Sequence, residues 1–341
     1  MIKGKVLLIA PTFRNLYKDL IEELKRQGYE VTFVEDFLYQ NNLFRHIYEV
    51  LGCLFYPYYL RHRYKVYSKH WREIFQRKDI NLNFDYIIAV DGHSSCDCLF
   101  NKLNQVNPKI KKILYTFDTV SNIYRFDLNY KYYDKIYTFD IDDAVKYNIN
   151  LLPIWWSTSD FYGEHYNIFG FASFGIGWKR YNVFNGIAIR AKELGLNTLI
   201  KLYVSPREES RLVKFLKRVF QLDKSLSVNK DIITHKEIEP ENYRGLINSA
   251  DIILDAIGHK QSGMTTRFSW ALGAGKKIIT DNVSVSKYPF YDPKQIFIVT
   301  DDYRIPAHFF FEKFHMKEEV RSEVEKFRID NFIKTLLNFD A

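Results

Sequence analysis

Residues 251–281, with the sequence DIILDAIGHKQSGMTTRFSWALGAGKKIITD, contain the alternation that decides the fold. The apolar strand Ile252–Leu254 leads into a loop that contains glycines. A helix-like segment follows this loop, and a second apolar strand ends at Asp281. Strand, helix and strand at this close spacing form the repeating unit of a doubly wound parallel sheet. We therefore expect an α/β fold around this stretch.

The loop inside this stretch carries groups suited to a phosphate. Gly258 and Gly263 are spaced as in a P-loop, but Met264 stands where that loop needs its lysine. A P-loop lysine binds the β- and γ-phosphates of a triphosphate, and a diphosphate ligand has no γ-phosphate. Thr265–Arg267 open the next helix, where unpaired backbone N–H groups and the helix dipole attract anions. The loop is therefore interpreted as a diphosphate site; the alternative is a plain helix cap with an exposed arginine.

The same alternation extends along the whole chain. Lys5–Ala10 is a continuous apolar run, as expected for a strand buried on both faces, and a helix over 16–27 follows it. Further strands are expected at 29–36, 84–92, 111–119, 134–140 and 150–156, and then at 170–175, 197–205, 231–238, 251–256, 276–282 and 295–299. Helices are expected at 178–196, 206–221 and 239–250, with one long terminal helix at 317–337. This pattern predicts two doubly wound α/β domains in tandem.

Composition limits the class of protein. A chain of 341 residues is long enough for about two domains. The net charge of +8 favours an anionic partner, although a lysine-rich composition alone can produce it. Cys53, Cys96 and Cys98 are too few for a disulfide framework and lack the spacing of a zinc site, which indicates reduced cytosolic thiols. No window approaches 18 uncharged apolar residues, and the first apolar run is short for a signal peptide, so we expect a cytoplasmic protein.

In layout, the chain resembles the GT-B glycosyltransferases. Within residues 240–300, the segments PENYRGLINSADIILDA and QSGMTTRFSWALGAGKKIITDN are similar to the donor-binding half of bacterial capsule and lipopolysaccharide glycosyltransferases. The resemblance implies two Rossmann-like doubly wound domains facing a cleft. Residues 1–156 would bind the acceptor, residues 157–315 would bind the nucleotide-sugar, and a helix in 316–341 would cross back to the first domain.

The implied activity is transfer of a sugar from a nucleotide-sugar to a glycan or lipid-linked acceptor in surface polysaccharide synthesis. Enzymes of this fold usually need no cofactor or catalytic metal. Two other functions stay open: a non-catalytic partner of the same fold that docks another transferase at the membrane, and a sugar-nucleotide epimerase or hydrolase.

Candidate catalytic residues stand at the carboxyl ends of strands in the first half. Asp91, His93 and Asp118 are the candidates, and Asp91 is the first choice for the base that an inverting transfer needs. A carboxylate and an imidazole in one short turn can tune each other. A retaining transfer would need no strong base. The structural alternative is that each aspartate caps the following helix.

Candidate donor-binding residues stand at the corresponding positions of the second half. Lys179 and Arg180, after a second glycine loop, would stabilise charge on a leaving diphosphate, whereas the alternative is a tight turn with solvent-facing cations. Many of the similar transferases carry a ribose-binding acid where this chain has Trp270, which leaves Asp255 and Asp281 as the nearest acids. The donor-binding candidates are Gly175, Gly177, Lys179, Arg180, Tyr203, His235, Ile238, His259, Gly263, Thr265, Thr266 and Arg267.

Residues 43–78 form an aromatic and basic segment. From Arg61 to Lys78 the sequence contains seven Lys or Arg residues and one acid, Glu73. Basic and aromatic side chains together are typical of helices at a membrane interface, so the segment predicts peripheral attachment to the inner face of the cytoplasmic membrane. The alternative is a helix with core aromatics and solvated charges. Nucleic acid is not expected as a partner, because no recognition motif accompanies the charge.

Overall fold

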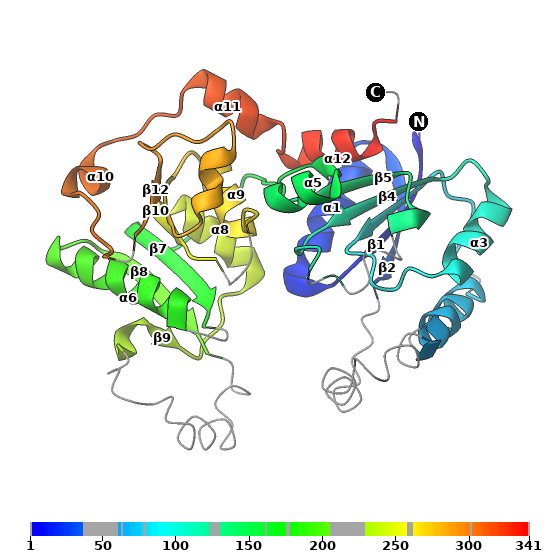
Figure 1. The fold of residues 1–341 in the computed structure, drawn as a ribbon, viewed down its shortest axis with the longest axis horizontal. Helices are drawn as coiled ribbons and strands as arrows, with labels where there is room; N and C mark the ends of the chain where they lie inside the picture. Colours follow the sequence, from blue (N-terminus) through cyan, green and yellow to red (C-terminus); the bar gives the residue numbers. More distant parts are fainter. Residues whose placement is uncertain are drawn as a thin grey trace, which may run out of the picture. The chain divides into compact units, whose positions relative to one another are not determined.

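Each half of the chain builds its own parallel six-stranded sheet (Figure 1). The computed structural model describes residues 2–36, 61–62, 64–77, 80–121, 123, 130–160, 162–174, 178–204, 229–257, 262–300 and 302–339. The chain divides into a first unit, Met1–Leu152 with Ile329–Ala341, and a second unit, Pro153–Arg328. The two doubly wound sheets that the strand pattern predicted are thus confirmed.

In the first unit, the sheet has the order β2-β1-β3-β4-β5-β6. Its strands are β1 (Gly4–Ala10), β2 (Tyr29–Glu35), β3 (Tyr86–Val90), β4 (Lys111–Thr116), β5 (Lys135–Thr138) and β6 (Asn150–Leu151). Since β2 and β3 lie on opposite sides of β1, the winding direction reverses between β1 and β3. Ligands of such sheets bind outside the carboxyl ends at this switch point. The strand predicted at 150–156 is shorter because Pro153 has no N–H to continue the ladder.

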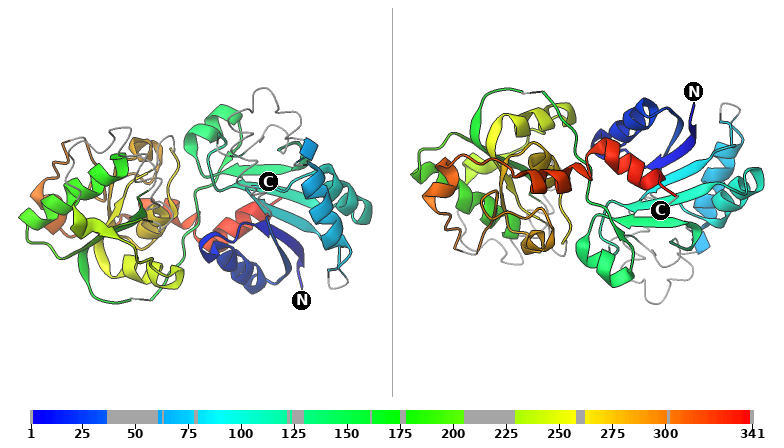
Figure 2. Two further views of the ribbon diagram at one scale, coloured as in Figure 1. Left: turned by 90° about the horizontal axis from the view of Figure 1, so that it is seen from below. Right: turned by 90° about the horizontal axis from the view of Figure 1, so that it is seen from above.

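Helices complete the first unit. They are α1 (Leu16–Arg26), a helix over 64–75, α3 (Asp97–Val106), α5 (Ile141–Tyr147) and α12 (Ile329–Leu337), with single 3₁₀ turns η1 (Phe13–Asn15) and η2 (Tyr130–Tyr132). Both views in Figure 2 show α12, in red, beside α1, in blue. The ring of Phe332 on α12 packs edge-on against Tyr115 of β4, with ring centroids 4.9 Å apart. The last helix is therefore part of the first unit's core.

The second unit has the order β12-β11-β10-β7-β8-β9, and its winding reverses between β7 and β10. Its strands are β7 (Tyr166–Ser173), β8 (Thr198–Tyr203), β9 (Ile233–Thr234), β10 (Ala250–Asp255), β11 (Lys277–Thr280) and β12 (Ile296–Ile298). Its helices are α6 (Trp178–Glu193), α8 (Pro240–Asn248), α9 (Thr266–Gly273), α10 (Ala307–Phe311) and α11 (Glu318–Glu325), with 3₁₀ turns η3 (Lys230–Ile232) and η4 (Val283–Lys287). The strand predicted at 231–238 is shorter, because η3 occupies its start. The helix predicted at 206–221 lies outside the described residues.

The single terminal helix predicted at 317–337 is wrong. The backbone breaks between α11 and α12, where Phe327 accepts a hydrogen bond from the N–H of Trp156 at 3.2 Å and Arg328 pairs with Trp156 as an isolated bridge. The Trp156 indole also donates to the carbonyl of Val324 at 2.9 Å. This pairing takes backbone groups that a continuous helix would need, so α11 ends in the second unit and α12 belongs to the first.

The described part of the basic aromatic segment packs into the first unit. Tyr67, Trp71 and Ile74 are buried in its core, and the Trp71 indole donates to the carbonyl of Ser94 at 3.0 Å. The exposed side chains on this helix and before it include four cations, Arg61, Lys65, Lys69 and Arg72, and one acid, Glu73, which lies 3.9 Å from Lys69. These aromatics are therefore core residues, as the alternative interpretation stated; residues 43–60, 63 and 78 lie outside the described part. In the portion of the chain that the structure describes, no helix has the length and apolarity needed to cross a membrane.

Candidate functional site

A strained turn follows β3 at the switch point of the first unit. Asp91 has φ 62° and Gly92 also has φ 62°, so two consecutive residues adopt the left-handed conformation. Non-glycine residues are uncommon in this region, although aspartate is among those enriched there, and strained residues concentrate at functional sites. Glycine is needed at position 92, because a Cβ there would lie 2.8 Å from the Tyr133 hydroxyl and 3.0 Å from that of Ser95. The turn therefore holds Asp91 in one fixed geometry.

The Asp91 carboxylate is buried and accepts hydrogen bonds from the loop that follows β4. Its Oδ1 accepts the backbone N–H of Phe117 at 2.6 Å and that of Asp118 at 3.2 Å. Its Oδ2 lies 4.0 Å from Nε2 of His93. Burial raises the pKa of Asp91 to about 6, with His93 and the Phe117 N–H opposing the rise and Asp36 reinforcing it. A carboxylate with this pKa is ionised at neutral pH yet close to the range that suits proton transfer.

His93 and Asp118 differ from Asp91 in exposure. The His93 side chain is 18% exposed and lies in the same turn. Asp118 is exposed, and its Oδ1 accepts the N–H of Thr119 at 2.7 Å. The aspartate that caps a helix after a strand is Asp140, which accepts the N–H groups of Asp142 and Asp143 at the start of α5. All three catalytic candidates thus lie at one sheet edge, and their roles stay predictions.

Asp36 was missed as a site residue. It follows β2, is 4% exposed, and accepts the N–H of His93 at 2.7 Å and that of Ser94 at 2.8 Å. Asp36 ends the strand predicted at 29–36, and the other candidates were selected because they stand at strand ends. The same criterion could therefore have identified it. The packing that directs its carboxylate to the turn after β3 was not readable in the sequence.

In the second unit, Arg267 on α9 forms a buried network with β7, β10 and α8. Its guanidinium lies 2.7 Å from Oδ1 of Asp255 and donates to the carbonyl of Phe171 and to the Tyr243 hydroxyl. Burial disfavours the charged form, but Tyr243 and Asp255 outweigh it and raise the pKa of Arg267. The arginine predicted to bind a diphosphate therefore directs these donors at protein groups.

The loop before α9 is likewise bound internally. Thr265 caps the helix by accepting the N–H of Phe268 at 3.1 Å, and its hydroxyl donates to Asp255 at 2.8 Å. Thr266 is the first residue of α9 and is half-buried. The Gly263 carbonyl accepts from the side chain of Asn282 at 3.2 Å. Met264 is fully buried, so its side chain is a core group rather than a substitute for a phosphate-binding lysine.

Lys179 and Arg180 lie in the first turn of α6, after β7. Lys179 Nζ is 3.0 Å from Oδ2 of Asp281, and its side chain is 45% exposed. Arg180 donates to the carbonyls of Ser173 at 2.7 Å and Ala256 at 3.2 Å, which spans the switch point between β7 and β10. Burial, assisted by the nearby Arg267, lowers the pKa of Arg180 from its ordinary value. Cations therefore gather where a doubly wound sheet binds its ligand.

The remaining donor candidates are spread along the same edge of this sheet. Tyr203 ends β8 and stacks on Phe171, with ring centroids 6.5 Å apart. His235 follows β9, is exposed, and its Nδ1 lies 3.2 Å from the Val204 carbonyl. Ile238 is half-buried in the segment before α8. Gly175, Gly177 and His259 lie outside the described residues.

Trp270, which stands where an acid was expected, is almost fully buried on α9. The guanidinium carbon of Arg244 lies 5.2 Å from its ring centroid. Both nearby acids have protein partners: Asp255 holds Arg267, and Asp281 holds Lys179 while accepting the N–H of Ile257 at 2.8 Å. Neither carboxylate has both oxygens available to a ribose in this arrangement.

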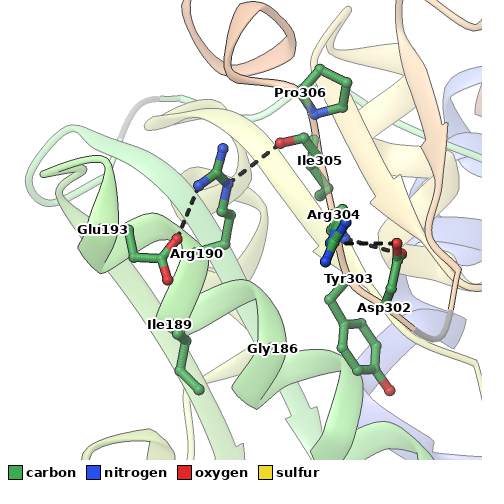
Figure 3. A pocket seen from close by; sticks show the side chains of 9 residues that line it. All are labelled: Gly186, Ile189, Arg190, Glu193, Asp302, Tyr303, Arg304, Ile305 and Pro306. Carbon is green, nitrogen blue, oxygen red and sulfur yellow. Dashed lines mark hydrogen bonds and ion pairs between the residues drawn. The ribbon is translucent and has the colours of Figure 1, made fainter.

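A separate pocket lies between α6 and residues 302–306 (Figure 3). Its volume is about 650 Å³, and it is lined by Gly186, Ile189, Arg190, Glu193, Asp302, Tyr303, Arg304, Ile305 and Pro306. Its charged side chains pair with each other: Arg190 with Glu193 at 2.9 Å, and Arg304 with Asp302 at 3.8 Å. None of the described donor candidates lines this pocket.

Among the described residues, no group of three or more His, Cys, Asp or Glu side chains is arranged to hold a metal ion. The expectation that the reaction uses neither metal nor cofactor stays a prediction.

No protein-family model matches the sequence, and no curated protein matches it significantly. The fold, however, matches solved structures over nearly the whole chain. An α,α-trehalose-phosphate synthase (UDP-forming) from Burkholderia vietnamiensis superposes with a TM-score of 0.55 at 9% identity, covering 97% of this chain and 95% of that one. The N-terminal domain of a trehalose-6-phosphate phosphatase from Candida albicans gives 0.53 at 13% identity, covering 100% and 98%.

A further trehalose-6-phosphate synthase gives a TM-score of 0.53 at 10% identity, covering 97% of this chain and 98% of that one. At such identities the likeness concerns the fold alone. It confirms the predicted GT-B fold class, with two Rossmann-like units.

Proposed function

We propose that this protein is a glycosyltransferase that moves a sugar from a nucleotide-sugar donor to a hydroxyl of a glycan acceptor. The observation that supports it best is the Asp91 turn, a buried carboxylate with a pKa near 6 at the switch point of the first GT-B unit. The second unit contributes Lys179 and Arg180 at its own switch point. A UDP-forming synthase with the same fold is consistent with a nucleotide-sugar donor.

In an inverting transfer, the Asp91 carboxylate accepts the proton of the acceptor hydroxyl. The acceptor oxygen attacks the anomeric carbon of the donor sugar as the bond from that carbon to the diphosphate oxygen breaks. Negative charge then develops on the leaving nucleoside diphosphate, and Lys179 and Arg180 are the cations proposed to stabilise it. A retaining transfer would use the same cations without a strong base.

The first test is donor binding. Thermal shifts are measured with UDP-, GDP-, dTDP- and CMP-sugars, because a ligand at 100 times its Kd stabilises by about 2.7 kcal/mol. Asp91→Asn should keep the shift with the active donor and lose transfer, whereas the matched strand-end variant Asp140→Asn should keep both. An active Asp91→Asn enzyme would exclude Asp91 as the base.

The finer assignment is a lipid-linked acceptor of bacterial surface polysaccharide, such as capsule or lipopolysaccharide, used at the cytoplasmic face of the membrane. It is supported by the cationic face of helix 64–75 and residue 61. Because Trp71 and Tyr67 are buried in the core, we propose electrostatic docking on anionic lipid without insertion of these rings.

Vesicle sedimentation tests this docking with phosphatidylcholine, with and without phosphatidylserine. Arg61→Glu combined with Lys65→Glu and Lys69→Glu should lower binding to the anionic vesicles by about 100-fold or more, since each basic residue contributes about 1 kcal/mol. A control variant reverses three exposed lysines of the second unit, Lys294, Lys313 and Lys317, and has the same net charge. Equal loss in both variants would indicate a general charge effect rather than docking by this helix.

A non-catalytic partner protein is the second candidate function. It is favoured by the buried Trp270 and by the internal bonding of Arg267. The two functions differ in the thermal-shift screen, because a protein that has lost donor binding should respond to none of the four nucleotide-sugars.

A further inference from the structure

The carboxylate of Asp36 links two strand ends across the sheet of the first unit. The N–H of Asp36 continues the ladder from β2 by donating to the carbonyl of Ala10 on β1 at 3.0 Å. Its side chain reaches beyond β1 to the turn after β3, where Oδ2 accepts from His93 and Oδ1 from Ser94. The two oxygens thus hold two successive N–H groups of the turn that carries Asp91.

That turn needs an external hold. Asp91 is a non-glycine residue with φ 62°, and such left-handed conformations persist only where the surroundings enforce them. On one side Tyr133 and Ser95 leave no room for a Cβ at Gly92. On the other side the Asp36 carboxylate supplies charge-assisted bonds, which are stronger than neutral ones.

Asp36 also acts on Asp91 through its charge. The charged groups that face Asp91 are Asp36 after β2, His93 within the turn, and Asp118 after β4. Asp36 and Asp118 favour the protonated form of Asp91, and His93 favours the ionised form. A carboxylate that is buried to 4% exposure is screened little by solvent.

We propose that Asp36 is the positioning residue of the candidate catalytic turn: it clamps the N–H groups of His93 and Ser94 and thereby sets the orientation and charge environment of Asp91. This inference rests on the proposed role of Asp91, but its test needs neither donor nor acceptor. In this role Asp36 touches no reacting atom itself and acts through Asp91.

The test compares Asp36→Asn with Asp140→Asn. Asp140 is a matched control, because it also follows a strand, is 2% exposed, and accepts two successive N–H groups. Carboxyl ¹³C NMR follows the titration of Asp91, whose signal is identified by its loss in Asp91→Asn. Amide hydrogen exchange is measured at His93 and Ser94.

In Asp36→Asn we expect the Asp91 midpoint to move to lower pH, because a like charge is removed. We also expect His93 and Ser94 to exchange about tenfold or more faster, as an amide loses a bond to a charged acceptor. Asp140→Asn should change neither reading. An unchanged Asp91 midpoint in folded Asp36→Asn, or the same change in both variants, would overturn the proposal.

If Asp36→Asn does not fold, the wild-type protein still provides a test. NMR couplings across hydrogen bonds should link the amide nitrogens of His93 and Ser94 to the carboxyl carbon of Asp36. Absence of both couplings, when couplings across the backbone hydrogen bonds of β3 are detected, would overturn the proposal. Absence of sugar transfer changes none of these readings, so a failed proposed function and a failed clamp are distinguishable.

Discussion

The guanidinium of Arg267 and the carboxylate of Asp255 form an ion pair of 2.7 Å in which the two side chains are only 11% and 1% exposed. Three donors converge on one oxygen of Asp255: the Thr265 hydroxyl and two nitrogens of Arg267. This pair joins the end of β10 to the first turn of α9. The arginine that sequence reasoning assigned to a ligand is thus also a structural element of the second unit.

Removing one member of this pair should be costly. In Asp255→Asn, the Arg267 guanidinium stays buried without its counter-charge, and breaking a buried pair in this way costs about 3–5 kcal/mol. Asp251→Asn is the matched control on the same strand, because Asp251 is 51% exposed and pairs with His165 at 3.0 Å. An exposed pair contributes about 0–1 kcal/mol. Urea unfolding of both variants checks this; similar losses would contradict it.

The raised pKa of Asp91 makes stability depend on pH in a specific direction. The folded pKa is about 6 and the ordinary value 3.8, so between these values the native state binds one proton more than the unfolded state. Stability from this group is therefore present at low pH and is lost as pH rises through about 6. The size of the effect is on the order of 3 kcal/mol.

Asp91→Asn should lack this dependence. We expect the difference in free energy of unfolding between wild type and Asp91→Asn to change across this pH range and to be constant above it. Urea titrations at a series of pH values measure the difference, which cancels the contributions of groups that do not interact with Asp91. Parallel curves for the two proteins would show that burial does not raise the pKa of Asp91.

Substitution of Gly186 in α6 should destabilise the protein, because the ring of Tyr303 packs directly against it. A Cβ at this position would lie 2.6 Å from both Cγ and Cδ2 of Tyr303. Replacing a helical glycine by alanine normally stabilises by about 1 kcal/mol, but overpacking costs about 1–3 kcal/mol. Gly186→Ala should therefore destabilise wild type and stabilise a Tyr303→Gly background, which also lacks the Cβ that would lie 3.0 Å away. A double-mutant cycle by thermal unfolding measures this coupling, and additive effects would exclude the contact.

Phe339 should anchor the end of the chain to the first unit. Its ring centroid lies 4.7 Å from Nζ of Lys111 and 5.0 Å from Nζ of Lys135. Each such contact at a partly exposed site contributes about 0.5–1 kcal/mol, so Phe339→Ala should cost about 1–2 kcal/mol. Phe311, which is 61% exposed, provides the control. Equal melting temperatures for Phe339→Ala and wild type would contradict the anchor.

Much of the fold was readable in the sequence because strand burial and helix periodicity are local signals. The apolar run at Lys5–Ala10, the helix ended by Gly28 and the strands ending near Asp91 and Asp281 all occur as predicted. The predicted elements that the structure does not contain were altered by residues far away in the sequence. The terminal helix breaks because Trp156 takes backbone bonds near Phe327, and no periodicity in 317–337 signals that partner.

The candidate site divides in the same way. That parallel strands end at one edge follows from topology, so the rule that selects polar residues at strand ends placed Asp91, His93 and Asp118 together. Which side chains then bond to each other depends on neighbours that the order of the chain does not reveal. His93 and Asp36 are 57 positions apart and meet only because β1 lies between β2 and β3.

The sequence by itself determined two parallel α/β sheets and the strand ends where chemistry is concentrated, because both depend on periodicity and on turn residues. Only the tertiary structure decided which of those polar groups are bound to the protein and which face outward. Arg267 is buried beside Asp255, whereas Lys179 pairs with Asp281 but keeps a side chain that is 45% exposed. The physical reason is that a buried charge needs a partner within the protein, whereas an exposed charge is solvated by water. Burial is a property of the packed chain.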